Sequence, residues 1–235
     1  MEQAYGSVSI STVNARFMSR VYGWMTGGLC ITGAVAWNVA GNPALVHTIF
    51  GNRLLFWILI IAQLGAVMAL SALINRISGA AATLIYILYS GLTGLTLASI
   101  FLIYTGASIA QAFVVTAFSF AGLSSFGYLT KRDLGPVGSF CMMGLFGLVG
   151  FAVLSLFFPA LMGGAGSFTF SIAGIIVFAG LTAYDTQKIK AMNDPRQEGT
   201  DAGQKTAIFG ALTLYLDFIN LFLSLLRLTG GRRQN

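Results

Sequence analysis

The chain has 235 residues, of which 56% are hydrophobic and only 9% are charged, and its formal net charge is +6. Soluble domains carry about 25% charged residues, so this composition excludes a soluble globular protein and indicates a polytopic membrane protein. A separate soluble domain would need on the order of 50 residues of mixed composition, and the sequence contains no such stretch.

The first 20 residues lack a cleavable apolar segment, so we expect a short cytosolic arm over 1–20 and no signal peptide. A transmembrane domain over 21–228 and a short basic tail over 229–235 are expected to follow. Seven apolar segments are long enough to cross a hydrocarbon core of about 30 Å. They lie at about 21–40, 54–74, 80–104, 107–129, 137–158, 168–187 and 207–228.

The connections between these segments are short and rich in turn residues, except for the longer, charged connection over 188–205. No alternating strand pattern competes, so the prediction is an all-α protein with seven transmembrane helices. Gly23-x-x-x-Gly27 matches a motif that lets membrane helices approach closely. Cys30 and Cys141 fall in apolar runs, where we expect packing thiols rather than a disulfide, and His47, expected in a connecting loop, is the only histidine.

The lysines and arginines predict the orientation of the chain. With a cytosolic N-terminus, nine of the 13 basic residues lie inside and four lie outside. They flank the apolar segments, which favours the lipid bilayer as a partner and argues against nucleic acid. The basic C-terminus fits poorly outside, so two alternatives remain: seven full spans, which we favour, or a last helix that crosses incompletely.

Two aspartates lie inside apolar segments: Asp185 in the sixth and Asp217 in the seventh. A carboxylate in a hydrocarbon-embedded helix costs roughly 2.5–3.5 kcal/mol on insertion scales, so each is a candidate functional residue and each is the natural partner of the other. About ten apolar residues precede Asp217 and about nine follow it, which at 1.5 Å per residue places it near the membrane midplane. Asp185 lies three residues before Lys188, so an interfacial, solvated carboxylate is the alternative there.

Two carboxylates in contact in a dry site cannot both ionise cheaply, so they share a proton and titrate as a unit. Such a pair is a pH-operated latch between two helices. The same oxygens suit Ca²⁺, although two carboxylates fall short of the six or more ligands of a tight site, so we expect at most transient binding. Possible supporting polar groups are Tyr215 near Asp217, Asn220 three residues after it, and Asp133. A loop aspartate beside Lys131 and Arg132 is, however, usually a solvated salt-bridge partner.

Five segments carry a resemblance to a known family: residues 128–134, 181–190 and 211–227, with 21–25 and 89–97. They resemble the Bax inhibitor-1 family of transmembrane proteins, and residues 21–25 and 89–97 fit its bacterial branch. The resemblance implies two three-helix layers around a central C-terminal helix. It also implies a pH-sensitive calcium leak gated by a hydrogen-bonded aspartate pair, at the positions of Asp185 and Asp217. A basic residue near the end of the second helix, here Arg76, is implied as a counter-ion.

The leading hypothesis is therefore a proton-regulated calcium channel of a bacterial inner membrane, without enzymatic activity and without a cofactor, for which Ca²⁺ and H⁺ are the transported or regulating ions. A proton-coupled cation exchanger would use the same carboxylates alternately. An intramembrane aspartyl protease needs two such aspartates as well, but Leu214-Tyr215-Leu216 replaces the Gly-x-Gly expected before its second aspartate. A purely structural or partner-binding membrane protein predicts that both aspartates can be neutralised without loss.

Overall fold

The computed structural model describes residues 10–74, 76–231 and 233, and its regular elements within these ranges are all helical. They are α1 (Ile10–Ala40), α2 (Pro43–Gly51), α3 (Arg53–Leu73), α4 (Gly79–Ile103), α5 (Gly106–Leu129), α6 (Gly135–Phe157), the short 3₁₀ helix η1 (Pro159–Met162), α7 (Gly164–Ala191), the 3₁₀ helix η2 (Pro195–Gln197) and α8 (Asp201–Thr229). The all-α prediction is confirmed.

Six helices, α3 to α8, are each long and apolar enough to cross a membrane. The number rises to seven if α1 and α2, which meet at an angle of 100°, are counted as one bent span. The predicted apolar segments therefore fall on α1 and on α3 to α8, with ends that move by up to about ten residues.

The first helix is longer than predicted, and one predicted loop is a helix. Helix α1 begins at Ile10, inside the segment predicted as an arm, because Val13 and Phe17 are buried four residues apart and extend its packed face. Residues 43–51, predicted as a loop that contains His47, form helix α2. The Asn42 side chain accepts hydrogen bonds from the first amides of this helix and Pro43 occupies its first turn, which is a strong start signal.

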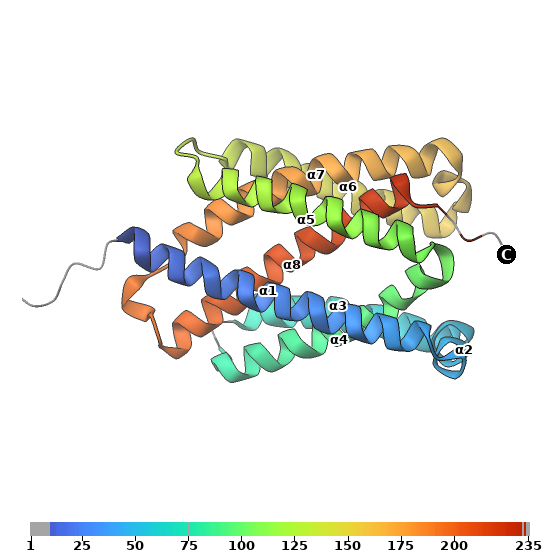
Figure 1. Cartoon of the computed structure of the whole chain (residues 1–235), viewed down its shortest axis with the longest axis horizontal. Helices are drawn as coiled ribbons and strands as arrows, with labels where there is room; N and C mark the ends of the chain where they lie inside the picture. The colour runs from blue at the N-terminus through green and yellow to red at the C-terminus, as the bar shows by residue number, and fades with distance from the viewer. Residues whose placement is uncertain (1–9, 75, 232, 234–235) are drawn as a thin grey trace, which may run out of the picture.

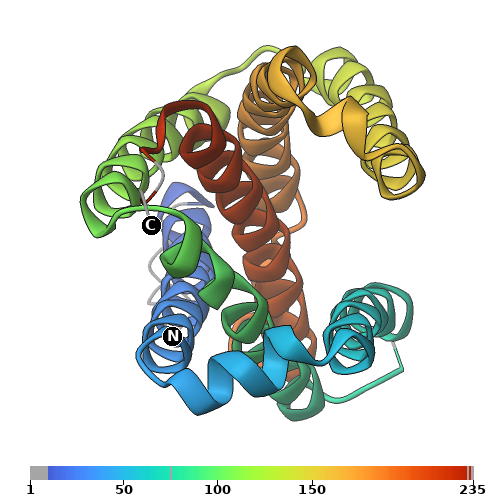
Figure 2. The same ribbon diagram turned by 90° about the vertical axis from the view of Figure 1, so that its right-hand side faces the viewer.

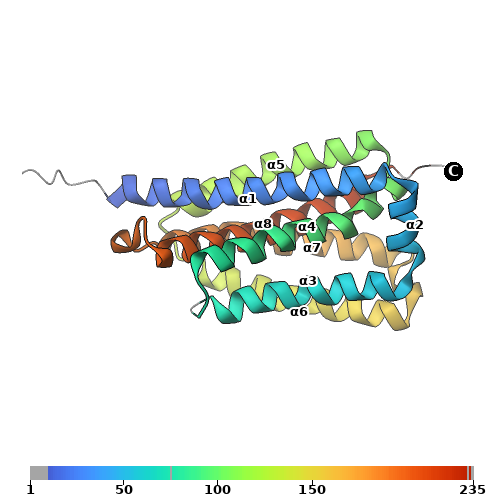
Figure 3. The ribbon, with the colours of Figure 1, turned by 90° about the horizontal axis from the view of Figure 1, so that it is seen from below.

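The helices form two layers with α8 between them. Figure 2 looks along the bundle and shows α1, α3 and α4 on one side of α8 and α5, α6 and α7 on the other. The middle helix of each layer, α4 or α7, joins its two neighbours and packs on α8. Along one edge of the molecule lie α1 and α5, and along the other lie α3 and α6 (Figure 3). The layered arrangement around a C-terminal helix is thus confirmed.

The N-terminal end of α1 lies beside the starts of α4 and α8 and the ends of α5 and α7 (Figure 1). The opposite end holds α2 and the end of α8. This places the predicted inside residues together at one end, which we call the N-terminal face. Most of α8 is buried, whereas nearly all apolar side chains of α3 and α6 are at least partly exposed, as in helices that face lipid.

Close packing depends on glycines other than the predicted motif. A Cβ at Gly23 or Gly27 would meet open space. At Gly28 it would overlap the Tyr86 hydroxyl, and at Gly94 it would lie 2.7 Å from the carbonyl oxygen of Thr32. Glycine therefore brings α1 and α4 together, although one position away from the Gly23-x-x-x-Gly27 pair.

Candidate functional site

The site lies where α7 packs on the central helix α8. Asp217 is at the middle of α8 and is only 4% exposed. Asp185 is half-buried on α7, six residues before that helix ends at Ala191. Because α7 continues past Lys188 and Lys190, Asp185 lies inside the helix and not at its end.

The two carboxyl groups lie close enough to interact with each other directly. Among the described residues, Oδ2 of Asp217 is buried and receives no hydrogen bond from a donor of the chain. A buried polar atom without a partner is costly, and a proton held between the two groups would supply the missing hydrogen bond. Proton sharing itself stays a prediction, because it is a property of the pair's titration.

The surroundings of the pair are mostly small and weakly polar. Cys141 of α6 is buried and lies close enough to both carboxyl groups to interact with them electrostatically. Thr182, about one turn before Asp185 on α7, and Thr186, directly after it, are buried and bond to carbonyls of their own helix. Thr186 also meets Ser124 of α5 at 3.2 Å. The charged neighbour of Asp185 is Lys188. In the described part of the chain Lys188 forms no ion pair with Asp185.

The other predicted residues form no hydrogen bond or ion pair with the two carboxyl groups in the described part of the chain. Arg76 is exposed in the α3–α4 connection and forms no ion pair with either aspartate in the described ranges. Asp133 is exposed and accepts a hydrogen bond of 2.9 Å from the amide of Gly135, in a turn before α6. Asn220 donates to the carbonyl of Leu216 in its own helix, at 2.8 Å.

Tyr215 points to the opposite side of α8, where it belongs to a second buried polar cluster. Its hydroxyl meets that of Thr32 on α1 at 2.6 Å, and Thr32 donates to the carbonyl of Ser90 on α4 at 2.8 Å. The rings of Tyr86 and Tyr89 pack edge-on against the Tyr215 ring. This cluster joins α1, α4 and α8, and sequence reasoning missed it. A signal was present, since positions 86, 89, 90 and 93 are polar at i, i+3, i+4 and i+7 and so share one helix face.

A third group of polar contacts lies at the N-terminal face, where α7 ends after Asp185. The Gln187 side chain donates to the carbonyl of Arg132 and accepts from the amide of Leu134, both at 2.9 Å. Lys190 donates to the carbonyl of Tyr128 at 2.7 Å and lies 4.3 Å from the centre of that ring. The end of α7 thus holds the connection between α5 and α6.

The donor set fits a weakly held cation at most. Two carboxylates supply fewer oxygens than the six to eight that Ca²⁺ prefers, and no cluster of three or more His, Cys, Asp or Glu that could hold a metal occurs within the described ranges. The pair could therefore hold a cation only if water or backbone carbonyls supplied the remaining ligands.

Comparison with known proteins places the chain in a family. The chain is 50% identical over 220 residues to the inner membrane protein YbhL of Escherichia coli, with 92% of each chain covered. It is 42% identical over 223 residues to a protein of Borreliella burgdorferi, with 95% of each covered. The family model described as inhibitor of apoptosis-promoting Bax1 matches residues 14–234. With this match over nearly its whole length, the chain belongs to the Bax inhibitor-1 family.

Proposed function

We propose that this protein is a proton-regulated leak pathway for Ca²⁺, switched by the Asp185–Asp217 pair. The observation that carries the proposal is the meeting of two acidic side chains, one of them 4% exposed, between α7 and the central helix. Ionisable residues inside membrane helices are rare, because a charged side chain in hydrocarbon is costly. Those that occur usually mark ion or proton pathways. The name of the Escherichia coli relative supports the bacterial inner membrane as the location.

The switch follows from the charge of the pair. With one proton shared, the pair is a hydrogen bond that holds α7 against α8. Without it, two unit charges about 4 Å apart repel by about 4 kcal/mol at an effective dielectric constant of 20. That energy exceeds the 1–3 kcal/mol by which sites in proteins are commonly coupled, so it suffices to shift α7 relative to α8.

The sign follows from the protonation states. The contact arrangement binds a proton more tightly than the separated arrangement, so acid favours contact and alkali favours separation. Separation leaves two carboxylates that attract a divalent cation. We therefore expect Ca²⁺ flux to rise as pH rises through the titration of the pair.

The test is Ca²⁺ entry into liposomes that contain a calcium-sensitive dye and the reconstituted protein, followed across pH. In Asp185→Asn and in Asp217→Asn the flux should lose its pH dependence, because an amide does not titrate. Asp133→Asn is the matched control, since it makes the same chemical change at an exposed carboxylate in a turn. Normal pH-dependent flux in both pair variants would refute the proposal.

The same liposomes separate the other hypotheses. A leak lets Ca²⁺ run only down its gradient, whereas a proton-coupled exchanger drives it uphill when a pH gradient is imposed. We propose no enzymatic activity for this site. Cleavage of a model transmembrane substrate that stops in the two asparagine variants would instead establish a protease.

A further inference from the structure

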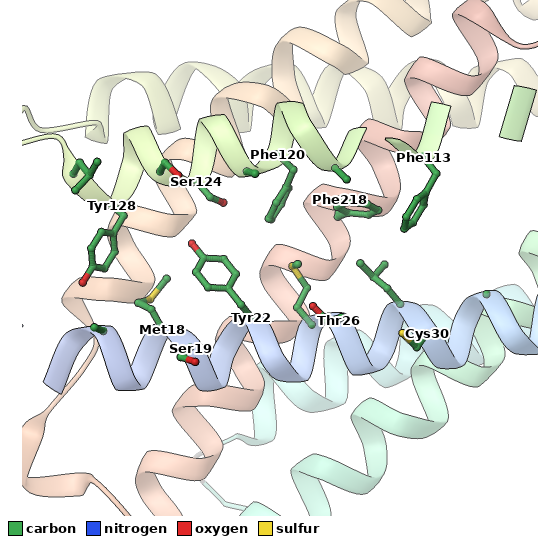
Figure 4. A pocket seen from close by; sticks show the side chains of 18 residues that line it. Met18, Ser19, Tyr22, Thr26, Cys30, Phe113, Phe120, Ser124, Tyr128 and Phe218 are labelled. Carbon is green, nitrogen blue, oxygen red and sulfur yellow. The ribbon is translucent and has the colours of Figure 1, made fainter. Parts of the chain in front are cut away.

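A long groove separates α1 from α5. Figure 4 shows α1 and α5 running side by side, with Tyr22 pointing from α1 across the gap and Phe218 of α8 at the back. The cavity has a volume of about 1000 Å³. It exists because α1 packs on α4 and α8, while α5 packs on α7 and α8, so α8 forms the floor between two helices of different layers.

The groove is lined mainly by apolar side chains along the length of the spans. Its walls include Met18, Leu29, Phe113, Phe120 and Leu129. Phe113 is 46% exposed and Leu129 is 73% exposed, so the groove opens sideways, toward the space that lipid fills. Its lining contains no acidic residue, which does not suit a cation route. An apolar groove open to the bilayer suits a hydrocarbon chain.

The groove ends at two arginines on the N-terminal face. An adjoining cavity of about 610 Å³ shares Ala15 and Ser19 with it and is lined by Arg16 and Arg20. Neither arginine forms an ion pair in the part of the chain that the structure describes, and Glu198 is the acidic residue in the same lining. This end of the groove, its mouth, therefore carries two positive charges and one negative charge. It adjoins the apolar part of the groove, which we call the trough.

The dimensions match one phospholipid in one leaflet. From Ala15 to Gly33 the groove follows 18 residues of α1, which at 1.5 Å per residue is roughly 27 Å. Half of a hydrocarbon core is about 15 Å, and the headgroup region adds about 6 Å. A lipid with its phosphate beside the arginines would therefore reach Phe113 and Phe218 with the end of an acyl chain.

We propose that the α1–α5 groove binds one anionic phospholipid from the leaflet at the N-terminal face. Arg16 and Arg20 hold its phosphate, and one acyl chain lies along Phe120 and over Phe218. The occupant is a lipid rather than a second copy of the chain, because a basic mouth joined to an apolar trough has the charge and polarity pattern of a single amphiphile. The proposal is independent of the aspartate pair and of Ca²⁺ transport.

The experiment is native mass spectrometry of the full chain in detergent, titrated with phosphatidylglycerol or phosphatidylcholine of the same acyl composition. One phosphatidylglycerol should bind more tightly than phosphatidylcholine, by about fivefold for each arginine that contacts the phosphate. Arg16→Gln with Arg20→Gln should remove this preference. Arg53→Gln, which removes an exposed charge at the opposite end, should keep it.

A second variant tests the trough itself. Ala121 is exposed and lines the groove, so Ala121→Trp should block the acyl chain and weaken both lipids without a change of charge. The proposal is overturned by equal binding of the two lipids to the wild type, by an equal loss of preference in Arg53→Gln, or by Ala121→Trp that binds normally. It is overturned as well if dimers form in place of the lipid complex and Ala121→Trp abolishes them.

Discussion

The packing of α5 against α7 beside the aspartate pair should depend on the absence of a side chain at Gly127. This residue is buried, and a Cβ there would overlap the carbonyl oxygen of Ala183 and lie 2.9 Å from its carbonyl carbon. The obstacle is the backbone of α7, which no rotamer change can move. Gly127→Ala therefore forces the two helices apart near Asp185.

The expected cost is toward the upper end of the 1–3 kcal/mol typical of overpacking, about 2–3 kcal/mol. For a chain of this length each kcal/mol lowers the melting temperature by roughly 2–4 °C, so we expect a decrease of roughly 4–12 °C. The assay is thermal unfolding in detergent, followed by the fluorescence of the tryptophans. Gly122→Ala is the matched control in the same helix, because its Cβ would meet open space.

Gly122→Ala should leave the melting temperature unchanged or raise it slightly, since alanine is the better helix former by about 0.5–1 kcal/mol. The reasoning is refuted if Gly127→Ala and Gly122→Ala unfold at the same temperature. It is refuted equally if Gly127→Ala is stable while Gly122→Ala is not, because the backbone contact would then have no energetic role.

Three further changes test the polar contacts between helices. Thr32→Val leaves the buried hydroxyl of Tyr215 without its partner and should lower the free energy of unfolding by about 1–3 kcal/mol in the same assay. Adding Tyr215→Phe should recover part of this loss, and strictly additive losses would contradict the contact. Asp201→Ala removes the acceptor that lies 2.6 Å from the amide of Gly79 at the start of α4. The free energy of unfolding should fall by about 1 kcal/mol and hydrogen exchange at the start of α4 should become faster, whereas unchanged exchange would count against the contact. Gln187→Leu removes both hydrogen bonds to the α5–α6 connection, so limited proteolysis should cut that connection faster than in the wild type. Equal rates of cleavage would show that these hydrogen bonds do not hold the connection in place.

The long helices α1 and α3 to α8 followed from the sequence because the length of an apolar segment decides whether it can span a membrane. Asp217 stood out for the same reason: nine or ten apolar residues on each side leave a carboxylate no route to water. The segment 43–51 was misassigned although Asn42 and Pro43 mark its start, because a helix of nine residues is too short to give a length signal.

Features that depend on how the helices rotate against one another could not be predicted. The sequence does not distinguish Gly23 and Gly27, which face open space, from Gly28, which contacts Tyr86. Gln187 acquires its partners only because the α5–α6 connection returns to the end of α7. The groove between α1 and α5 likewise results from the packing of two layers on α8, and no local pattern encodes it.

Infrared difference spectroscopy across pH tests the central proposal most directly, because it detects the carbonyl stretch of a protonated carboxyl group. The chain contains only seven acidic residues, so the signal of one pair is resolvable with isotope-labelled aspartate. The account predicts a protonated carboxyl band at neutral pH that is lost in Asp217→Asn, shifted in Asp185→Asn and unchanged in Asp133→Asn. A wild-type spectrum in which every aspartate is ionised at neutral pH would contradict it.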